Sequence, residues 1–241
     1  MLNALKINSS ADNALLIAQS DVVARIPKAE LEKLEALGKT RRYPKGEFVF
    51  RAGDLGQNIY FLRRGRIKIS QPSPMGREVI LWFCFAGEIF GLSEIGRSGG
   101  RIVNAQICEN SEVLCVPYDA FKIFLANHPD TALLIMQVLS CRLRALGDVL
   151  VNLVTDDVNT RIAKLILRLG ANYGTRNGKH IFLSIHLTHQ EIADMVGTTR
   201  QTVTSVLGRL KRDGILSIDN QRIHIESEEL LSEMTHASVA G

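Results

Sequence analysis

The chain has 241 residues, a length that suits one large domain or two small ones. Hydrophobic residues make up 46% of it and charged residues 22%, a globular balance that excludes disordered, collagen-like and mucin-like classes. No apolar run approaches the roughly 18 residues of a membrane-spanning helix, and the N-terminus lacks the pattern of a secretory signal. We therefore expect a cytoplasmic protein that has no membrane partner and keeps its four widely spaced cysteines as reduced thiols.

The net charge is +4, and its distribution along the chain is uneven. Residues 155–225 carry ten Lys and Arg against six Asp and Glu, which gives +4. Residues 226–241 carry four Glu and neither Lys nor Arg, which gives −4 and indicates an acidic tail over 227–241. A basic globular segment followed by an acidic tail is compatible with nucleic-acid binding but does not establish it.

The first half of the chain predicts a small β domain. After an N-terminal extension over 1–21, residues 22–37 predict a short amphipathic helix. Short alternating apolar segments follow, separated by glycine-containing turns: Glu47–Phe50, Ile59–Leu62, Arg66–Ser70, Glu78–Phe83, Ile102–Ile107 and Glu112–Val116. Strands at roughly ten-residue spacing are typical of an antiparallel barrel, roll or sandwich, and we predict a β-roll within a domain over 22–128.

A long helical pattern then covers residues 129–154. Its apolar residues have the 3-4-3-4-3 spacing of a coiled-coil seam: Met136, Leu139, Leu143, Leu146, Leu150 and Leu153. This spacing predicts a dimerisation helix, although the same stripe could instead pack against the roll as an intramolecular core. The cluster Thr155-Asp156-Asp157 predicts a hinge and the N-cap of a further helix, from Val158 to about Leu169.

The most informative stretch covers residues 187–216. Thr188 and Glu191 have the spacing of a capping box that opens a first helix, and Gly197 supplies a tight turn after it. Two short helices joined by a turn that contains glycine predict a helix-turn-helix motif. The alternative is a helix-turn-helix that makes only protein contacts.

The second helix of the motif is expected over Arg200–Arg212, capped by Thr198 or Thr199. Its apolar stripe consists of Val203, Val206, Leu207 and Leu210. The opposite face carries donors, acceptors and small groups without a carboxylate, which is the chemistry that base edges and phosphates require. Because N-terminal residues of a recognition helix reach deepest into the major groove, Arg200 and Gln201 are the leading readers. The expected DNA-binding residues are Thr188, Thr198, Thr199, Arg200, Gln201, Thr202, Thr204, Ser205 and Arg209.

The basic residues at the end of this helix, Arg209, Lys211 and Arg212, have a second reading as a solvated face that suits a helix C-terminus. Beyond the helix, a hairpin is expected from Ile215–Ile218, an Asp219-Asn220 turn and Arg222–Ile225, with a further strand over His180–Ile185. These elements complete a winged helix-turn-helix domain over 155–226.

The predicted α+β order of β-roll, long helix, hinge and winged helix-turn-helix resembles the CRP/FNR superfamily of bacterial transcription regulators, from about residue 22 to 226. The matching motifs are Gly87-Glu88, the DVxxRIA sequence over 157–163 and the GTTRQTV sequence over 197–203. The resemblance implies a cyclic-nucleotide-binding-like roll and a homodimer that binds a palindromic site on double-stranded DNA. It also implies RNA polymerase as a partner if the protein is an activator, and a signal received at the roll.

Members of this family that bind cyclic AMP use a Glu after Gly, an Arg-Ser pair and a Thr-Ser pair on the long helix. In this chain Gly87-Glu88 resembles the first feature. Arg97-Ser98 resembles the Arg-Ser pair, although two extra residues separate it from the next strand. Counting back from that strand instead places Gly99-Gly100 at the position of the pair, with Arg101 adjacent. The third position falls on Leu146-Gly147, which cannot donate and accept as hydroxyls do, so cyclic AMP is disfavoured. Glu88, Arg97, Ser98 and Arg101 remain effector candidates, and the two arginines could equally be solvated on a glycine-rich loop.

The sequence identifies no cofactor. An iron–sulfur cluster of the family's type is disfavoured because no cysteine precedes Cys84, and that cysteine lies in an apolar run typical of packed core. No histidine occurs in residues 1–127, so a roll histidine can ligate neither haem nor a cupin-type metal, and no catalytic motif is present. We predict a regulator rather than an enzyme. The alternative is an effector-independent DNA-binding regulator whose roll serves only dimerisation.

Overall fold

The computed structural model describes residues 22–74, 76–93, 99–219 and 222–236. The chain divides into two compact units, Ser20–Ser140 and a second that contains Cys141–Gly241. The long helix α5 (Pro129–Thr155) contributes to both units, since the division falls inside it.

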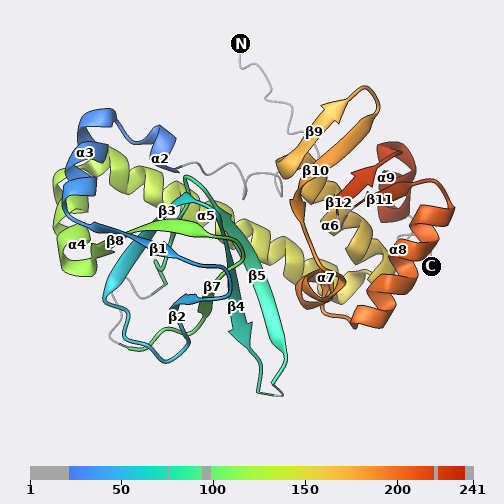
Figure 1. Ribbon diagram of the computed structural model, residues 1–241, viewed down its shortest axis with the longest axis horizontal. Helices are drawn as coiled ribbons and strands as arrows, with labels where there is room; N and C mark the ends of the chain where they lie inside the picture. Colours follow the sequence, from blue (N-terminus) through green and yellow to red (C-terminus); the bar gives the residue numbers. More distant parts are fainter. Residues whose placement is uncertain (1–21, 75, 94–98, 220–221, 237–241) are drawn as a thin grey trace, which may run out of the picture. The chain divides into compact units, whose positions relative to one another are not determined.

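The first unit begins with two short helices, α2 (Val22–Arg25) and α3 (Lys28–Ala36), shown in blue in Figure 1. The prediction of one helix over 22–37 is therefore wrong. Pro27 interrupts it, because proline has no N–H to donate and disfavours helical geometry at the preceding residue. Leu34 is fully buried, whereas Leu37 is exposed beyond the end of α3.

Two four-stranded sheets form the predicted roll (Figure 1). The first has the order β1-β8-β3-β6 and consists of β1 (Lys39–Tyr43), β8 (Ser111–Pro117), β3 (Asn58–Arg64) and β6 (Ile89–Phe90). The second has the order β2-β7-β4-β5 and consists of β2 (Phe48–Phe50), β7 (Asn104–Ile107), β4 (Arg66–Pro72) and β5 (Glu78–Phe85). All pairings are antiparallel, so the predicted roll is confirmed.

The roll has a core on each face of its first sheet. Phe50, Tyr60 and Phe90 belong to the inner core, together with apolar residues of β4, β7 and β8. On the outer face, Ile59 and Phe61 of β3 pack with helices α2, α3 and α5 and with α4 (Tyr118–Asn127). Because β3 is buried on both faces, it shows a continuous apolar run rather than alternation.

The second unit contains the C-terminal part of α5 and a winged helix-turn-helix. Helix α6 (Val158–Tyr173) is followed by β9 (Gly174–Asn177), β10 (His180–His186), α7 (His189–Val196), α8 (Arg200–Arg212), β11 (Leu216–Asp219) and β12 (Arg222–Ile225). The strands form one sheet with the order β11-β12-β10-β9. Asp219 pairs with Arg222, which confirms the predicted hairpin, although Asn220 itself lies outside the described residues.

The segment read as an acidic tail contains a helix, α9 (Glu228–His236). Its Leu231 is fully buried, and the Thr160 hydroxyl of α6 donates to the Met234 carbonyl over 3.3 Å. The three glutamates over 227–241 indicated charge and gave no sign of this packing.

Asp157 caps α6 as predicted, because its side chain accepts from the Thr160 N–H over 2.7 Å. That hydrogen bond lowers the pKa of Asp157. None of the four cysteines forms a disulfide, and Cys84 is fully buried in the inner core of the roll. Among the described residues, no helix is long and apolar enough to cross a membrane.

Candidate nucleic-acid interface

The helix-turn-helix is fixed locally by two caps and one glycine. The Thr188 side chain accepts from the Glu191 N–H over 3.1 Å, and the Glu191 carboxylate accepts from the Thr188 N–H over 2.8 Å. Gly197 ends α7 with φ +69°, a left-handed conformation that side chains with a Cβ rarely adopt. Thr199 caps α8 by accepting from the Thr202 N–H over 3.1 Å. The capping box, the turn and the second helix are thus confirmed, with Thr199 rather than Thr198 as the cap.

Helix α8 has one buried face and one exposed polar face. The buried face consists of the predicted stripe, Val203, Val206, Leu207 and Leu210, each at most 6% exposed. Arg200, Gln201, Thr204 and Ser205 are exposed on the other side. Helix α8 contains no carboxylate, so nothing within it would repel a phosphate backbone.

Several predicted contact residues already hold partners within the motif. The Thr199 and Thr202 hydroxyls lie 2.9 Å apart, and Thr188 is occupied by its capping box. Arg209 donates to the Asn159 amide oxygen of α6 over 2.8 Å, which ties α8 to α6. These groups position α8, whereas Arg200 and Gln201 are exposed in its first turn.

His189, at the start of α7, was missed by the sequence analysis. Its Nδ1 lies 2.8 Å from the Thr204 hydroxyl, which itself donates to the Arg200 carbonyl over 2.9 Å. The Thr204 hydroxyl thus links the His189 ring to the backbone of α8. The signal in the sequence was its position directly after the Thr188 cap, at the first residue of the first helix of the motif.

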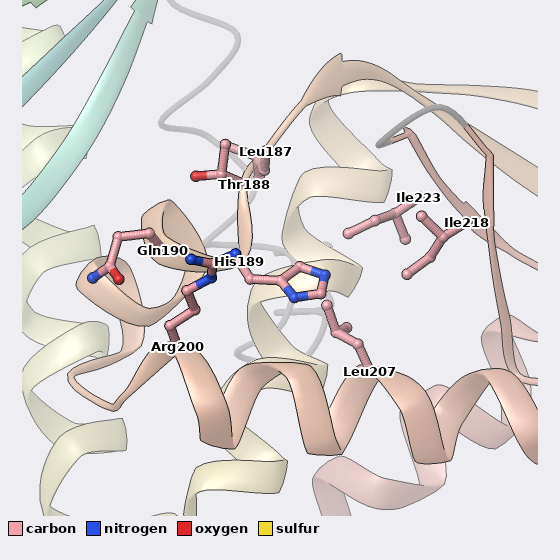
Figure 2. Close-up of a pocket in the computed structure, with 8 residues that line it drawn as sticks. All are labelled: Leu187, Thr188, His189, Gln190, Arg200, Leu207, Ile218 and Ile223. Atoms are coloured by element: carbon pink, nitrogen blue, oxygen red, sulfur yellow. The ribbon is translucent and has the colours of Figure 1, made fainter.

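A groove of about 490 Å³ runs between the two helices and the wing (Figure 2). It is lined by Leu187, Thr188, His189, Gln190, Arg200, Leu207, Ile218 and Ile223. Figure 2 shows the Arg200 side chain rising from α8 toward α7, with the His189 ring near Leu207. The groove therefore combines the polar side chains of Thr188, His189, Gln190 and Arg200 with the apolar side chains of Leu187, Leu207, Ile218 and Ile223.

The predicted seam of α5 faces away from the core of the single chain. Met136, Leu139, Leu143, Leu146, Leu150 and Leu153 are between 39% and 73% exposed. Apolar residues repeating along one helix face at this exposure are unusual in an isolated chain and are typical of an association surface.

The effector candidates of the roll are placed differently. Glu88 is 3% exposed in the turn between β5 and β6, and Arg101 is 2% exposed just before β7. Arg97 and Ser98 lie outside the described residues. The reading of Arg101 as a solvated arginine is therefore wrong.

Arg101 is held by the roll itself. Its guanidinium donates to the Gly91 carbonyl over 2.9 Å and to the Asn58 carbonyl, and lies 4.2 Å from the centre of the Phe50 ring. Phe50, Tyr60 and Phe90 stack on one another with ring centres 5.1–6.2 Å apart. Burial raises the pKa of Tyr60, and the charge of Arg101 opposes that shift. The chain's own aromatic and cationic side chains thus occupy the inner core of the roll.

The comparison with known proteins agrees with this architecture. A family model of the cyclic nucleotide-binding domain matches residues 40–128, and one of the Crp-like helix-turn-helix domain matches residues 160–234. The CRP-like cAMP-activated global transcriptional regulator of Mycobacterium tuberculosis (strain ATCC 25618 / H37Rv) is 30% identical over 190 residues, covering 79% of this chain and 85% of the relative. The chain belongs to the CRP/FNR superfamily. It is a regulator of the CRP/FNR type with a DNA-binding helix-turn-helix, as the resemblance implied.

Other members of the CRP/FNR superfamily show the same relationship. The fumarate and nitrate reduction regulatory protein of Escherichia coli (strain K12) is 26% identical over 219 residues, covering 90% of this chain and 87% of the relative. A structure of a CooA mutant from Carboxydothermus hydrogenoformans superposes with a TM-score of 0.74 at 25% identity, covering 84% of this chain and 90% of that one. The c-di-GMP responsive regulator CLP of Xanthomonas campestris, 24% identical with a TM-score of 0.72, covers 83% of this chain and 100% of its own and shares the fold.

Proposed function

We propose that the protein acts as a homodimer that reads a palindromic site on double-stranded DNA with the exposed face of α8. The observation that carries this proposal is the polar, carboxylate-free face around Arg200 and Gln201, held rigidly by two caps and Gly197. Arg can bridge guanine O6 and N7, and Gln can bridge adenine N6 and N7. Its site of action would be the cytoplasm, where such DNA lies.

The exposed seam supports the dimer. Two copies joined along α5 would bury six apolar side chains that the single chain leaves exposed. Two recognition helices related by a two-fold axis would engage half-sites about 10–10.5 bp apart, or a multiple of that. If the protein is an activator, RNA polymerase is its further partner.

We further propose that any signal at the roll is not cyclic AMP. Leu146 and Gly147 supply no side-chain hydroxyl where the resemblance places the adenine contacts, and Arg101 is already committed to two backbone carbonyls. Relatives with this architecture carry names that mention cAMP, nitrogen, or fumarate and nitrate, so the architecture alone does not specify the signal. A small-molecule effector would reach Glu88 or Arg101 only by displacing existing contacts of the roll, since both are buried. Arg97 and Ser98 remain effector candidates from the sequence alone.

The buried cluster around Arg101 favours a second candidate, a constitutive regulator whose roll serves only dimerisation. Phe50, Tyr60, Phe90 and Arg101 pack on one another in the inner core, and the pocket of about 460 Å³ in the roll is lined by Phe50 and Tyr60 but not by Glu88 or Arg101. In this case the DNA affinity of the protein would be independent of any added ligand.

Selection from a random duplex library at about 150 mM salt tests the proposal, with salt fixed because affinity depends on it steeply. One arm uses the purified protein alone, and the other adds a small-molecule extract of the source cells. A two-fold symmetric site should emerge in at least one arm. Emergence in both favours the constitutive regulator, and emergence only with extract favours gating. A pool that stays random in both arms would overturn the proposal.

A further inference from the structure

The second unit contains a polar ladder between α5 and α6 that the sequence analysis did not anticipate. The Lys164 ammonium of α6 donates to the Asp156 carboxylate over 2.7 Å and to the Asn152 amide oxygen over 3.0 Å. One helical turn further along α6, Arg168 interacts electrostatically with Asp148. Asp148 and Asn152 of α5 and Asp156, the residue directly after α5, are spaced by four residues, and the Asp156 N–H still donates to the Asn152 carbonyl over 3.0 Å. The three side chains therefore form one row opposite Lys164 and Arg168.

The ladder is partly shielded from solvent. The Asp156 side chain is 6% exposed and the Lys164 side chain 32% exposed. Burial lowers the pKa of the Arg168 guanidinium, and the Asp148 charge opposes that shift. Charge pairs shielded in this way are screened less by salt than surface pairs, and losing one partner is costly because the other remains desolvated.

The ladder and the seam occupy different sides of α5. At 3.6 residues per turn, the row at positions 148, 152 and 156 lies roughly 140° around the helix from the leucines at 143, 146, 150 and 153. A partner copy can therefore pack on the seam leucines at 143, 146 and 150 while the ladder contacts α6 on a different side of the same helix.

A second set of contacts extends from the ladder to the recognition helix. Arg161 donates from Nη1 to the Asp156 carbonyl over 2.8 Å and from Nε to the Val196 carbonyl over 3.0 Å. Val196 is the last residue of α7, directly before the Gly197 turn that leads into α8. A Cβ at Gly197 would lie 3.4 Å from the Leu153 side chain, so the last leucine of the seam adjoins this turn.

We propose that this ladder, formed by Asp148, Asn152 and Asp156 with Lys164 and Arg168 and extended by Arg161, locks the recognition helix at a fixed position relative to the dimer seam. Residues 155–157 then form a rigid junction between α5 and α6 and not a flexible hinge. Lys164 and Arg161 are positioning residues, and they set which spacing of half-sites the dimer accepts. The inference rests on the proposed function, since it concerns how two recognition helices meet DNA.

Half-site spacing is the measurement that separates a lock from ordinary structural support. A change of one base pair turns one half-site about the helix axis relative to the other, because B-DNA repeats every 10–10.5 bp or so. Wild-type protein should prefer one spacing and lose affinity when a base pair is inserted or deleted. Lys164→Met keeps the aliphatic stem and removes the ammonium, so its preference for the optimal spacing should fall about 2- to 30-fold.

The matched control is Lys179→Met, an exposed lysine of the same unit that is outside the ladder. It should keep the wild-type spacing profile. Asp156→Asn is a second, milder variant, expected to change the profile in the same direction by less, and it serves if Lys164→Met does not fold. The inference would be overturned if either ladder variant lost affinity equally at every spacing. It would also be overturned if either variant kept the wild-type spacing profile.

Hydrogen–deuterium exchange of the free protein provides a readout that needs no DNA. Amides between residues 153 and 165 should exchange faster in Lys164→Met than in wild type or Lys179→Met, because the junction between α5 and α6 is no longer rigid. Unchanged exchange there would contradict the lock even if DNA binding were confirmed. A different result would be faster exchange in Lys164→Met together with a wild-type protein that selects no DNA site. That result would support the contacts between α5 and α6 but would overturn the proposed function and, with it, the expected effect on half-site spacing.

Discussion

The helix-turn-helix and the roll use arginine in opposite ways. Arg200 is exposed at the first turn of a capped helix, whereas Arg101 is 2% exposed and donates to the carbonyls of Gly91 and Asn58. The first arrangement leaves a guanidinium available for a partner outside the chain, and the second uses it to close the chain's own core. The helix-turn-helix therefore presents a charged side chain that could bind DNA, whereas the arginine of the roll stabilises the fold of the roll itself.

The comparison extends to their apolar residues. In the roll, Phe50, Tyr60 and Phe90 fill the inner core. Along α5 the leucines of the seam remain exposed, with Leu143 at 73%. The aromatic side chains of the roll are thus buried within the chain. The surfaces that we expect to contact DNA and a second copy, in contrast, carry side chains that are exposed in the single chain.

Breaking the seam should have the largest effect. Leu143→Glu places a carboxylate at the most exposed seam position and should yield monomers in sedimentation. Affinity for a palindromic site should fall by about 10³-fold or more, toward non-specific binding. Ile123→Glu, on α4 and also strongly exposed, should leave the dimer intact. A Leu143→Glu protein that still sediments as a dimer would place the interface elsewhere.

Removing Arg101 should destabilise the roll. Arg101→Met loses two hydrogen bonds of a charged donor and leaves two carbonyls unsatisfied, so the free energy of unfolding should fall by about 2–5 kcal/mol. Arg77→Met, an exposed arginine of the roll, should change it by less than about 0.5 kcal/mol. Urea unfolding measures both. An Arg101→Met protein as stable as wild type would return Arg101 to the list of groups free to bind an effector.

Much of the helix-turn-helix could be predicted because its signals are local. Thr188, Glu191, Gly197 and Thr199 act on residues within a few positions, so their roles follow from spacing. The burial of Arg101 and the Lys164 ladder depend on segments distant in the sequence, which no local pattern reports. Strand β1 was missed for a related reason: its sequence KTRRY is polar and exposed, and it is a strand because it pairs with β8.

The smallest expected effect concerns the start of α6, where sequence and structure agree most closely. Asp157→Ala removes the cap and should lower the free energy of unfolding by about 0.5–2 kcal/mol, whereas Asp157→Asn, which still accepts a hydrogen bond, should cost less. The pKa of Asp157 is lowered in the folded protein, so the carboxylate contributes stability at neutral pH. That contribution is lost as the pH falls through the lowered pKa, and the deficit of Asp157→Ala should shrink with it. A deficit that stays constant from neutral to strongly acidic pH would contradict this assignment.

The central claim is that the exposed face of α8 reads base edges, and the most direct test is a parallel selection with wild type and Arg200→Ala. Both proteins are offered the same random duplex library under the condition in which wild type selects a site. We expect wild type to select a two-fold site. Arg200→Ala should lose base preference at one symmetric pair of positions, which lowers the discrimination there by about 1–3 kcal/mol, while its non-specific binding stays intact. An Arg200→Ala pool with the wild-type motif would contradict the assignment of this helix face as the reading surface.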